Sequence, residues 1–297
     1  MSCVVCRCSV VSIRAAHVSG RVGSLHRTCT AVPLGDIPVR SRLYSSRDET
    51  WDGDSVMSGI ISSPNGIDVA GMRKAYKAGH EAFTEDELVS KEPIGQFAAW
   101  FKVASEQDSI GEANAMTLAT ASKEGRPSAR MVLLKGYDKE GFKFYTNYES
   151  RKGKELIDNP HAALCFYWEI LSRSVRIEGP VERLTEEEST KYFHSRPPTS
   201  QIGAVVSHQS TVIESRDVLT SKDNELKEKY LSTGLAIPKP NYWWGFRVIP
   251  EVVEFWQGQS NRLHDRVVFR RLKPGETADG TFVHEGENGW VYERLSP

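Results

Sequence analysis

Residues 254–269 contain the side chains best suited to chemistry, and they read EFWQGQSNRLHDRVVF. Side chains alternate between the two faces of an extended strand. If the second half of this stretch is a strand, Arg262, His264 and Arg266 share one face, beside Trp256. Such a face suits an anionic, planar ligand, because Arg pairs with phosphate or carboxylate and stacks on rings, and His exchanges protons near neutral pH. The alternative is a solvated strand face whose cations pair with acids elsewhere.

A second concentration of positive charge opens a helix predicted at 151–158, where the sequence reads SRKGKEL. Cations in a first helical turn oppose the helix macrodipole. An anion bound at the unsatisfied N–H groups would account for Arg151, Lys152 and Lys154, and Gly153 leaves room for close approach. The alternative is a solvated basic turn.

Two further cations stand in an apolar stretch at 128–136, which is predicted to form a buried strand. Arg130 and Lys135 need partners there, because an unpaired buried charge is costly. The partner is either an acid of the same fold or a bound anion.

A third group combines a phenol, a guanidinium and a hydroxyl. Tyr192 and Arg196 are four residues apart on a predicted helix and therefore on one face. Ser200 follows Pro197-Pro198 and is predicted to cap the next helix. Together with Lys135 these groups could hold a phosphate, although residues of these types are more often surface side chains.

The elements that must position these groups are many short strands and few helices. Helices are expected from Pro93, at 151–158, at 185–195 and at 216–230, and strands at 114–121, 128–136, 141–147, 162–170, 173–184, 242–249, 251–257, 262–271 and 289–295. This pattern predicts a mainly β fold with flanking helices, an antiparallel barrel or sandwich, rather than a βαβ sheet. No G-x-G-x-x-G or P-loop motif supports a Rossmann or P-loop nucleotide site.

Charge is distributed unevenly along the 297 residues. Residues 1–47 contain seven Arg, no Lys and one acid, so their net charge is +6. The net charge of the whole chain is −1, so the remaining residues have a net charge of −7. This balance does not favour nucleic-acid binding by the main body, and no apolar run approaches the roughly 18 residues that span a bilayer. Cys165 is the one cysteine outside the N-terminal tail, and it is predicted to be a small buried hydrophobic residue. The cysteine spacing indicates no metal site and no disulfide framework.

The Arg-rich, Ser-rich N-terminal stretch is typical of an organellar transit peptide, with a possible cleavage after Tyr44. The alternative is a tail without an address. The predicted location is therefore cytoplasmic or mitochondrial. Residues 45–68 are predicted to be a linker, so that a tail and linker over 1–68 precede one domain over 69–297.

The run WQGQSNRLHDRVVF at 256–269 resembles a signature of the pyridoxine-5′-phosphate (pyridoxamine-phosphate) oxidase family. Further resemblance lies in EANAM (112–116), SRKGKEL (150–156) and SQIGAVVSHQS (200–210), and it covers roughly residues 71–297. The resemblance implies an FMN-binding split β-barrel and a homodimer with FMN in the subunit interface.

The resemblance also implies roles for individual residues. FMN contacts are implied for Arg130, Met131, Val132, Leu133, Tyr145, Thr146, Arg151, Lys152, Gln209, Ser210, Trp256 and Arg266, and at the position of Ser174. Substrate contacts are implied for Lys135, Tyr192, Arg196, Ser200, Arg262, Leu263 and His264, with Arg73 and Tyr76 in a segment that closes over the substrate. Two residues depart from the family pattern: Ser174 replaces a common Gln, which puts FMN affinity in doubt, and Trp244 replaces a usual Gly and is expected to crowd a turn.

The implied activity is oxidation of pyridoxine 5′-phosphate and pyridoxamine 5′-phosphate to pyridoxal 5′-phosphate by hydride transfer to FMN, with O2 reduced to H2O2. In it, Arg262 and His264 are the expected catalytic residues. Two alternatives remain at this point: a non-catalytic carrier of FMN or pyridoxal phosphate, and a split-barrel flavin reductase that uses a nicotinamide cofactor.

Overall fold

The computed structural model describes residues 61–63, 66–68, 71–72, 74–77 and 81–297. Contacts within the chain divide it into Met1–Asp68 and Val69–Pro297. In the first unit the described residues form a hairpin of β1 (Ile61–Ser63) and β2 (Gly66–Asp68), within the stretch expected to be a linker. The second unit contains the sheet, the helices and the described site residues. The boundary predicted from composition stays a prediction.

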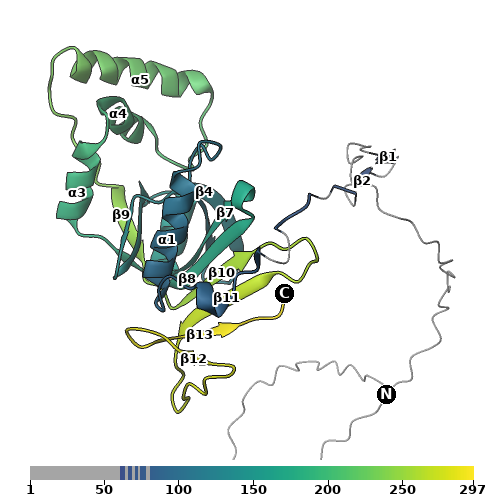
Figure 1. The fold of residues 1–297 in the computed structure, drawn as a ribbon. Coiled ribbons are helices and arrows are strands. Elements are labelled where there is room, and N and C mark those ends of the chain that lie inside the picture. Colours follow the sequence, from purple (N-terminus) through teal and green to yellow (C-terminus); the bar gives the residue numbers. More distant parts are fainter. Residues whose placement is uncertain (1–60, 64–65, 69–70, 73, 78–80) are drawn as a thin grey trace, which may run out of the picture. The chain divides into compact units, whose positions relative to one another are not determined.

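The second unit is mainly β with helices at its margins, as the sequence predicted (Figure 1). Its strands are β3 (Ala115–Ala121), β4 (Pro127–Leu133), β5 (Gly136–Asp138), β6 (Gly141–Asn147), β7 (His161–Trp168), β8 (Arg173–Arg183), β9 (Trp243–Val248), β10 (Val252–Gln257), β11 (Asp265–Arg271), β12 (His284–Glu285) and β13 (Trp290–Arg294). Its helices are α1 (Pro93–Ser105), α2 (Arg151–Asp158), α3 (Glu186–Ser195), α4 (Pro198–Val206) and α5 (Arg216–Leu231), with short 3-10 turns η2 (Glu85–Glu87) and η3 (Glu169–Leu171).

The strands form one antiparallel sheet that curls into a barrel. Its order is β12-β13-β11-β10-β8-β7-β3-β4, and β9 pairs with both β8 and β6, while β6 also pairs with β5. The chain passes from β4, which pairs with β3, directly into β5, which pairs with β6. This passage closes the ring of β3, β4–β5, β6, β9, β8 and β7, and β10, β11 and β13 extend the sheet beyond it.

Local sequence explains the helix starts. Pro93 is the first residue of α1, and the Glu92 side chain accepts a hydrogen bond from Gly95 N at 3.0 Å. A capping box of Thr185 and Glu188 starts α3, the helix that the sequence predicted at 185–195. Ser150 caps α2 by accepting from Gly153 N at 3.2 Å.

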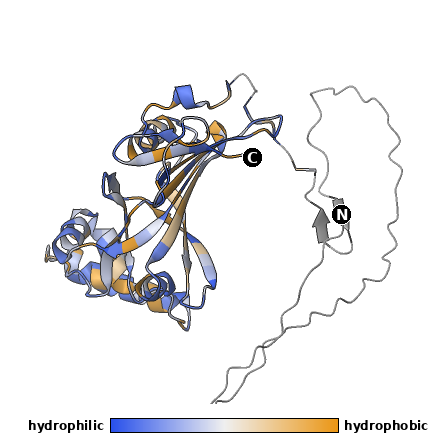
Figure 2. Cartoon of the chain, turned by 90° about the horizontal axis from the view of Figure 1, so that it is seen from below, coloured by the Kyte–Doolittle hydropathy of each residue, from blue (hydrophilic) through white to orange (hydrophobic). Residues whose placement is uncertain are grey.

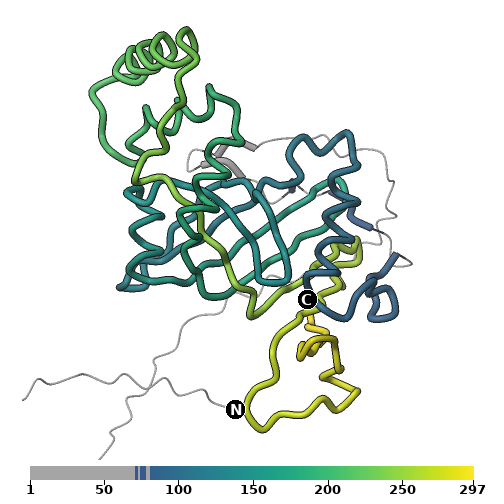
Figure 3. Tube along the Cα trace, turned by 90° about the vertical axis from the view of Figure 1, so that its left-hand side faces the viewer, coloured from purple at the N-terminus to yellow at the C-terminus, as the bar shows by residue number. Residues whose placement is uncertain are grey.

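The barrel interior is filled by aromatic and aliphatic side chains, which α1 covers on one side. Phe97 of α1 is fully buried, with its ring centroid 4.9 Å from that of Phe142 and 5.2 Å from that of Phe166. Figure 2 shows hydrophobic residues along the strands, and both hydrophobic and hydrophilic residues on the helices. A smaller apolar cluster joins α3, α4 and β9 around Phe193, Ile202 and Trp243. Figure 3 shows that α3–α5 and the C-terminal strands lie at opposite ends of the sheet.

Three local predictions were wrong. The stretch at 128–136 is not a buried strand, because β4 ends the main run of the sheet with alternate side chains exposed, and Met131 is 63% exposed. Ser200 does not cap a helix but lies inside α4, which begins at Pro198. Arg196 is the residue after α3 and has extended backbone, so it does not share a helical face with Tyr192.

The part of the chain that the structure describes contains no helix long and apolar enough to cross a bilayer. Within the same residues, no group of three or more His, Cys, Asp or Glu side chains is arranged to hold a metal ion. Cys165 is half-buried rather than buried, on the outward face of β7.

Candidate functional site

The N-terminus of α2 opens into a hollow of about 570 Å³ between β4, β6 and residues 209–210. Most of the side chains predicted to contact a cofactor line this hollow, and they come from four separate parts of the sequence. They are Arg130, Met131, Val132, Leu133, Tyr145, Thr146, Arg151, Lys152, Gln209 and Ser210, and Lys135 joins them at the rim. The fold therefore brings together residues that the sequence places up to 80 positions apart.

Lys152 is the most unusual of these residues, because its side chain is buried, with 8% exposure. Its Nζ donates to Gln209 Oε1 at 2.6 Å and to Thr146 Oγ1 at 3.3 Å, and no carboxylate of the described residues lies within ion-pair distance. Burial lowers the pKa of Lys152 to about 8, and the nearby charge of Arg130 contributes to this lowering. The solvated basic turn is therefore excluded for Lys152, whereas Arg151 is 63% exposed.

Helix α2 can approach this position because residue 153 is a glycine. A Cβ on Gly153 would lie 2.3 Å from the main-chain oxygen of Tyr148. The backbone that precedes the helix thus occupies the space beside Gly153. The expectation that this space is left for a ligand was wrong.

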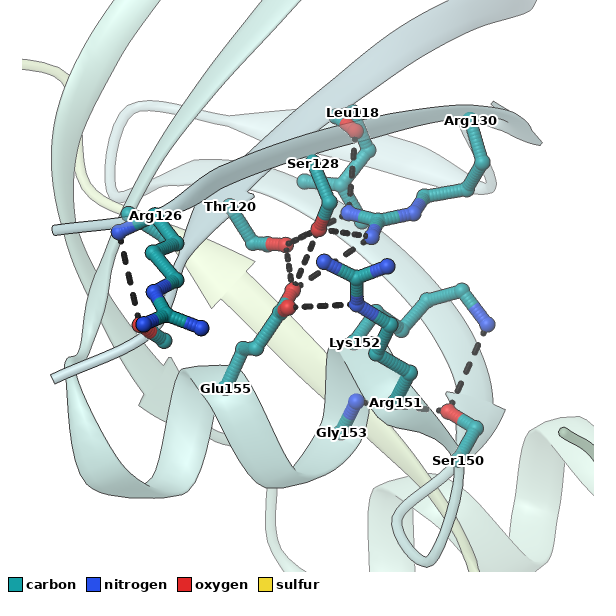
Figure 4. Close-up of polar contacts among 12 residues, drawn as sticks. Leu118, Thr120, Arg126, Ser128, Arg130, Ser150, Arg151, Lys152, Gly153 and Glu155 are labelled. Carbon is teal, nitrogen blue, oxygen red and sulfur yellow. Dashed lines mark hydrogen bonds and ion pairs between the residues drawn. The ribbon is translucent and has the colours of Figure 1, made fainter. Parts of the chain in front are cut away.

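Glu155 organises the cations around this helix, and the sequence analysis missed it (Figure 4). Its Oε1 accepts from Arg151 Nε at 2.8 Å, while its Oε2 accepts from Ser128 at 2.6 Å and Thr120 at 2.5 Å. Arg130 lies 3.4 Å from the same oxygen. Burial alone would raise the pKa of Glu155, but the hydrogen bonds outweigh it and lower the pKa to about 2. The i, i+4 spacing of Arg151 and Glu155 was the signal available in the sequence.

The charges of this cluster sum to +2 when Lys152 is protonated, because Arg130, Arg151 and Lys152 outnumber Glu155. The internal ion pair considered for Arg130 does exist, but it neutralises only part of the charge. A phosphate monoester carries close to two negative charges near neutral pH. The cluster therefore has the charge and the buried donors that a dianionic phosphate requires.

A stack of aromatic rings connects this hollow to the second predicted phosphate group. Tyr145 stacks on Tyr192 with 3.9 Å between ring centroids, and both stack with Trp243. The Arg196 guanidinium lies 4.8 Å from the Trp243 ring centroid, and its Nη2 donates to Ser200 O at 2.8 Å. Its Nη1 is buried without a hydrogen-bond partner among the described residues. A buried donor left without a partner indicates a place for an acceptor that the chain does not supply.

Three predicted cofactor contacts lie outside the hollow. Ser174, Trp256 and Arg266 are neighbours in one row across β8, β10 and β11. This row begins three strand positions from β4, about 14 Å along the sheet. Arg266 pairs with Glu254 at 2.9 and 3.1 Å, so part of its donor capacity is used inside the chain. A single copy of the chain thus contains two separated groups of predicted cofactor contacts.

The loop between β10 and β11 carries the predicted catalytic residues. The prediction that Arg262 and His264 lie on a strand was wrong, because β11 begins only at Asp265. Arg262 is exposed and has a positive φ of 64°, a conformation that costs a non-glycine residue about 1 kcal/mol or more. Leu263 is 68% exposed. Both side chains are therefore available to a ligand, on a turn rather than on a strand face.

His264 is held by its neighbours in a defined protonation pattern. Its Nδ1 accepts a hydrogen bond from Gln259 N at 2.9 Å, so in the neutral ring the proton resides on Nε2. The ring centroid lies 5.0 Å from that of Trp256 and 5.7 Å from that of Tyr76. Neutral His264 consequently presents a hydrogen-bond donor to a ligand. Arg73 lies outside the described residues.

The two departures from the family pattern have local explanations. The Ser174 hydroxyl donates to Phe166 O at 2.8 Å, so it is used within the sheet. Trp244 lies in β9 opposite Thr146 and not in a turn, and its ring is 5.9 Å from the Tyr148 ring and 4.3 Å from Lys239 Nζ. The expectation of a crowded turn was wrong, because Trp244 lies within a strand and packs against the main core, on the same strand face as Phe246.

Comparison with known proteins agrees with this geometry. The profile described as Pyridoxamine 5′-phosphate oxidase matches residues 105–229, and that described as Pyridoxine 5′-phosphate oxidase C-terminal dimerisation region matches residues 243–297. The crystal structure of PhzG from Burkholderia lata 383 in complex with tetrahydrophenazine-1-carboxylic acid is similar, with a TM-score of 0.63 and 31% identity over 72% of this chain and 97% of that one. The fold is the FMN-binding split barrel.

Two curated relatives are more similar in sequence. Pyridoxine/pyridoxamine 5′-phosphate oxidase of Bombyx mori is 57% identical over 82% of this chain and 97% of its own length. Pyridoxine-5′-phosphate oxidase of Bos taurus is 58% identical over 80% of this chain and 91% of its own length. The chain belongs to the pyridoxine/pyridoxamine 5′-phosphate oxidase family.

The Glu155 cluster gives a prediction about stability. A pKa of about 2 against the usual 4.5 corresponds to about 3 kcal/mol, present above pH 4.5 and lost as the pH falls through 2. We expect Glu155→Gln to lower the unfolding free energy at neutral pH by about 2 kcal/mol, read as a fall of several degrees in Tm. Asp158→Asn, which removes an exposed acid from the same helix, should leave Tm unchanged. Equal Tm values for the two variants would contradict a stabilising role for the cluster.

Proposed function

We infer that the chain oxidises pyridoxine 5′-phosphate and pyridoxamine 5′-phosphate to pyridoxal 5′-phosphate, as an FMN-dependent enzyme that reduces O2 to H2O2. The structural observation that carries the site assignment is the hollow at the start of α2, where a buried Lys152 lies in a cluster with a charge of +2. Bound FMN supplies the hydride acceptor and the reaction with oxygen. The remaining work of the chain is to bind, orient and cover the two phosphate-bearing molecules.

The FMN phosphate fits the hollow beside α2. The Lys152 and Arg151 side chains would hold its oxygens, because the main-chain N–H groups of Arg151 and Gly153 already donate to Ser210 and Ser150. Arg130 and Ser210 line the same space, and Glu155 keeps Arg130 and Arg151 in place. The buried ammonium of Lys152 forms no ion pair with a carboxylate of the described residues, and a phosphate dianion would neutralise it.

The substrate phosphate fits the neighbouring group. Arg196 would direct its unsatisfied Nη1 at the phosphate, with Lys135 on one side and the Tyr192 and Ser200 hydroxyls on the other. The stacked rings of Tyr145 and Tyr192 make the two phosphate positions neighbours, so binding energy far from the reacting carbon can orient it.

Arg262 and His264 would cover the substrate ring from the loop before β11. Arg262 is exposed and can lie over a ring face, and the Nε2–H of His264 can donate to the ring hydroxyl. Leu263 and Tyr76, which is 39% exposed, would complete this side, with Arg73 as a further predicted lid residue.

A homodimer explains why one copy has two separated groups of cofactor contacts. The C-terminal match to a dimerisation region supports assembly of two copies. If the row of Ser174, Trp256 and Arg266 meets the hollow of the second copy, the twofold axis passes midway, over β3 and β7. At the middle of this surface the outward side chains are small, with Ala119 paired to Ala163, and permit close approach.

The Arg-rich residues 1–47 lie outside the described residues, so a cytoplasmic or mitochondrial location stays a prediction from the sequence.

Lys152 makes FMN binding dependent on pH. Its pKa of about 8 means that the ammonium is present below pH 8, and that above pH 8 binding must take up a proton. We expect the FMN dissociation constant of the apoprotein to rise above pH 8, by at most about tenfold per pH unit, in flavin fluorescence titrations. Lys152→Met should bind weakly without this rise, and Lys154→Met, an exposed neighbour, should behave as the wild type. A wild-type constant that is flat up to pH 10 would contradict the assignment.

Arg262→Ala tests the catalytic loop. Because this side chain would cover the substrate and not the flavin, peroxide release per bound FMN should fall at least about tenfold while the FMN content is retained. Arg216→Ala, on the exposed surface of α5, is the matched control. Normal kinetics in Arg262→Ala would refute its role, and a wild-type protein that binds FMN yet releases no peroxide would favour the non-catalytic carrier.

Ala163→Arg tests the dimer. A long cation over β7 would prevent close approach of a second copy, so the variant should sediment as a monomer and lose FMN. Val218→Arg, at an exposed position of α5, should remain dimeric and yellow. If Ala163→Arg stays a dimer with full FMN content, the interface lies elsewhere.

A further inference from the structure

A buried carboxylate stands at the point where the catalytic loop enters β11. Asp265 is 7% exposed and accepts three hydrogen bonds. Its Oδ2 accepts from Phe83 N at 2.9 Å and from Gln259 Nε2 at 2.8 Å, and its Oδ1 accepts from Arg294 Nη1 at 2.9 Å. One side chain therefore joins the segment before η2, the catalytic loop and β13.

Gln259 extends this contact to the other end of the loop. Its side chain is 2% exposed and also donates to Glu81 O at 3.3 Å. Its main-chain N–H donates to His264 Nδ1, and its main-chain oxygen accepts from Arg262 N at 3.1 Å. The orientation of both predicted catalytic residues thus depends on where Gln259 is held.

Arg294 fixes the carboxylate from the other side. It donates to Asp265, to Phe83 O at 2.8 Å and to Glu85 at 2.8 and 3.0 Å. The hydrogen bonds from Arg294 to Glu85 raise the pKa of the guanidinium, so the group remains charged. Phe83 itself is 5% exposed and packs on Trp100 of α1. The group of Asp265, Gln259 and Arg294 is therefore connected to the main core through Phe83.

The loop has one further anchor, Ser260, whose N donates to Lys77 O at 2.9 Å and whose Oγ donates to Tyr76 O at 2.8 Å. Residues 260–263 are exposed, and Arg262 has a positive φ, which is unfavourable for any residue other than glycine. Beyond Ser260, the main-chain bond of Leu263 stays within the loop, to Asn261 Oδ1 at 2.9 Å. The position of Arg262 and His264 therefore depends on the ends of the loop, where Gln259 and Asp265 are buried and bonded to each other.

We propose that Asp265, with Gln259 and Arg294, is a positioning residue that holds Arg262 and His264 in the orientation needed for hydride transfer from the substrate. This inference rests on the proposed function. Asp265 does not reach the substrate itself; it acts through the loop. An error of about 1 Å in such a loop can cost a factor of about 100 in rate.

The test is Asp265→Asn in the FMN-loaded dimer. An amide has one acceptor oxygen and cannot accept three donors, so the loop loses at least one anchor. We expect kcat per bound FMN, measured by peroxide release from pyridoxine 5′-phosphate, to fall about 10- to 100-fold, with unchanged FMN affinity. Arg294→Lys keeps the positive charge but not the several donors of the guanidinium, so it should lower kcat by a smaller factor. It replaces Asp265→Asn as the test if that variant does not fold.

Glu293→Gln is the matched control, because Glu293 makes an ion pair between the same two strands through Arg270, away from the loop. It should leave kcat unchanged. If the positioning variants lose FMN and Tm but keep wild-type kcat per bound FMN, the role is merely structural and the inference fails.

Wild type and Arg262→Ala in the same assay separate this failure from failure of the proposed function. A second readout, the dissociation constant of pyridoxal 5′-phosphate from tryptophan fluorescence, does not depend on turnover. If the wild type is inactive, weaker binding in Asp265→Asn than in Glu293→Gln still supports a positioning role, and equal binding overturns it.

Discussion

The candidate site depends on a buried ammonium, that of Lys152, with which no carboxylate of the described residues forms an ion pair. Burial of Lys152 at the start of α2 lowers its pKa from the usual 10.5 to about 8, at a cost to the charged form. The surrounding structure accommodates this cost: Ser150 caps the helix, Gly153 lets it approach the preceding backbone, and Glu155 binds the neighbouring arginines. In the proposed site the FMN phosphate would offset the penalty, so that FMN affinity and the fold of this corner would depend on the same residues.

The position of β4 in the sheet connects that corner to assembly. An apolar strand with exposed alternate side chains is a liability in a monomer, because it exposes hydrophobic surface. In the proposed dimer the same strand lines the cofactor and the small side chains of β3 and β7 receive the second copy. Cofactor binding and dimerisation are then mutually dependent, because each half of the contacts comes from a different copy.

The catalytic loop shows a different physical solution. A helix or strand fixes side chains through its own hydrogen bonds, whereas residues 260–263 have few of these. Here orientation comes from a buried carboxylate and a buried amide at the ends of the loop, supported by Arg294 near the C-terminus. A loop held in this way can expose Arg262 and Leu263 to a ligand while His264 keeps a defined hydrogen-bond pattern.

The sequence by itself determined most of the local elements, including the helices at 151–158 and 185–195, and the residue motifs that indicate the family. It also placed Arg151, Lys152 and Lys154 in the first turn of α2. It could not determine that β11 begins at Asp265, because alternating side chains also occur in a turn, nor that β4 is exposed, because an apolar pattern does not specify what covers it. Only the tertiary structure decided that, among the described residues, no carboxylate pairs with Lys152 and no acceptor reaches Arg196 Nη1, and that Asp265 joins three segments. Burial and partnership depend on residues distant in the chain.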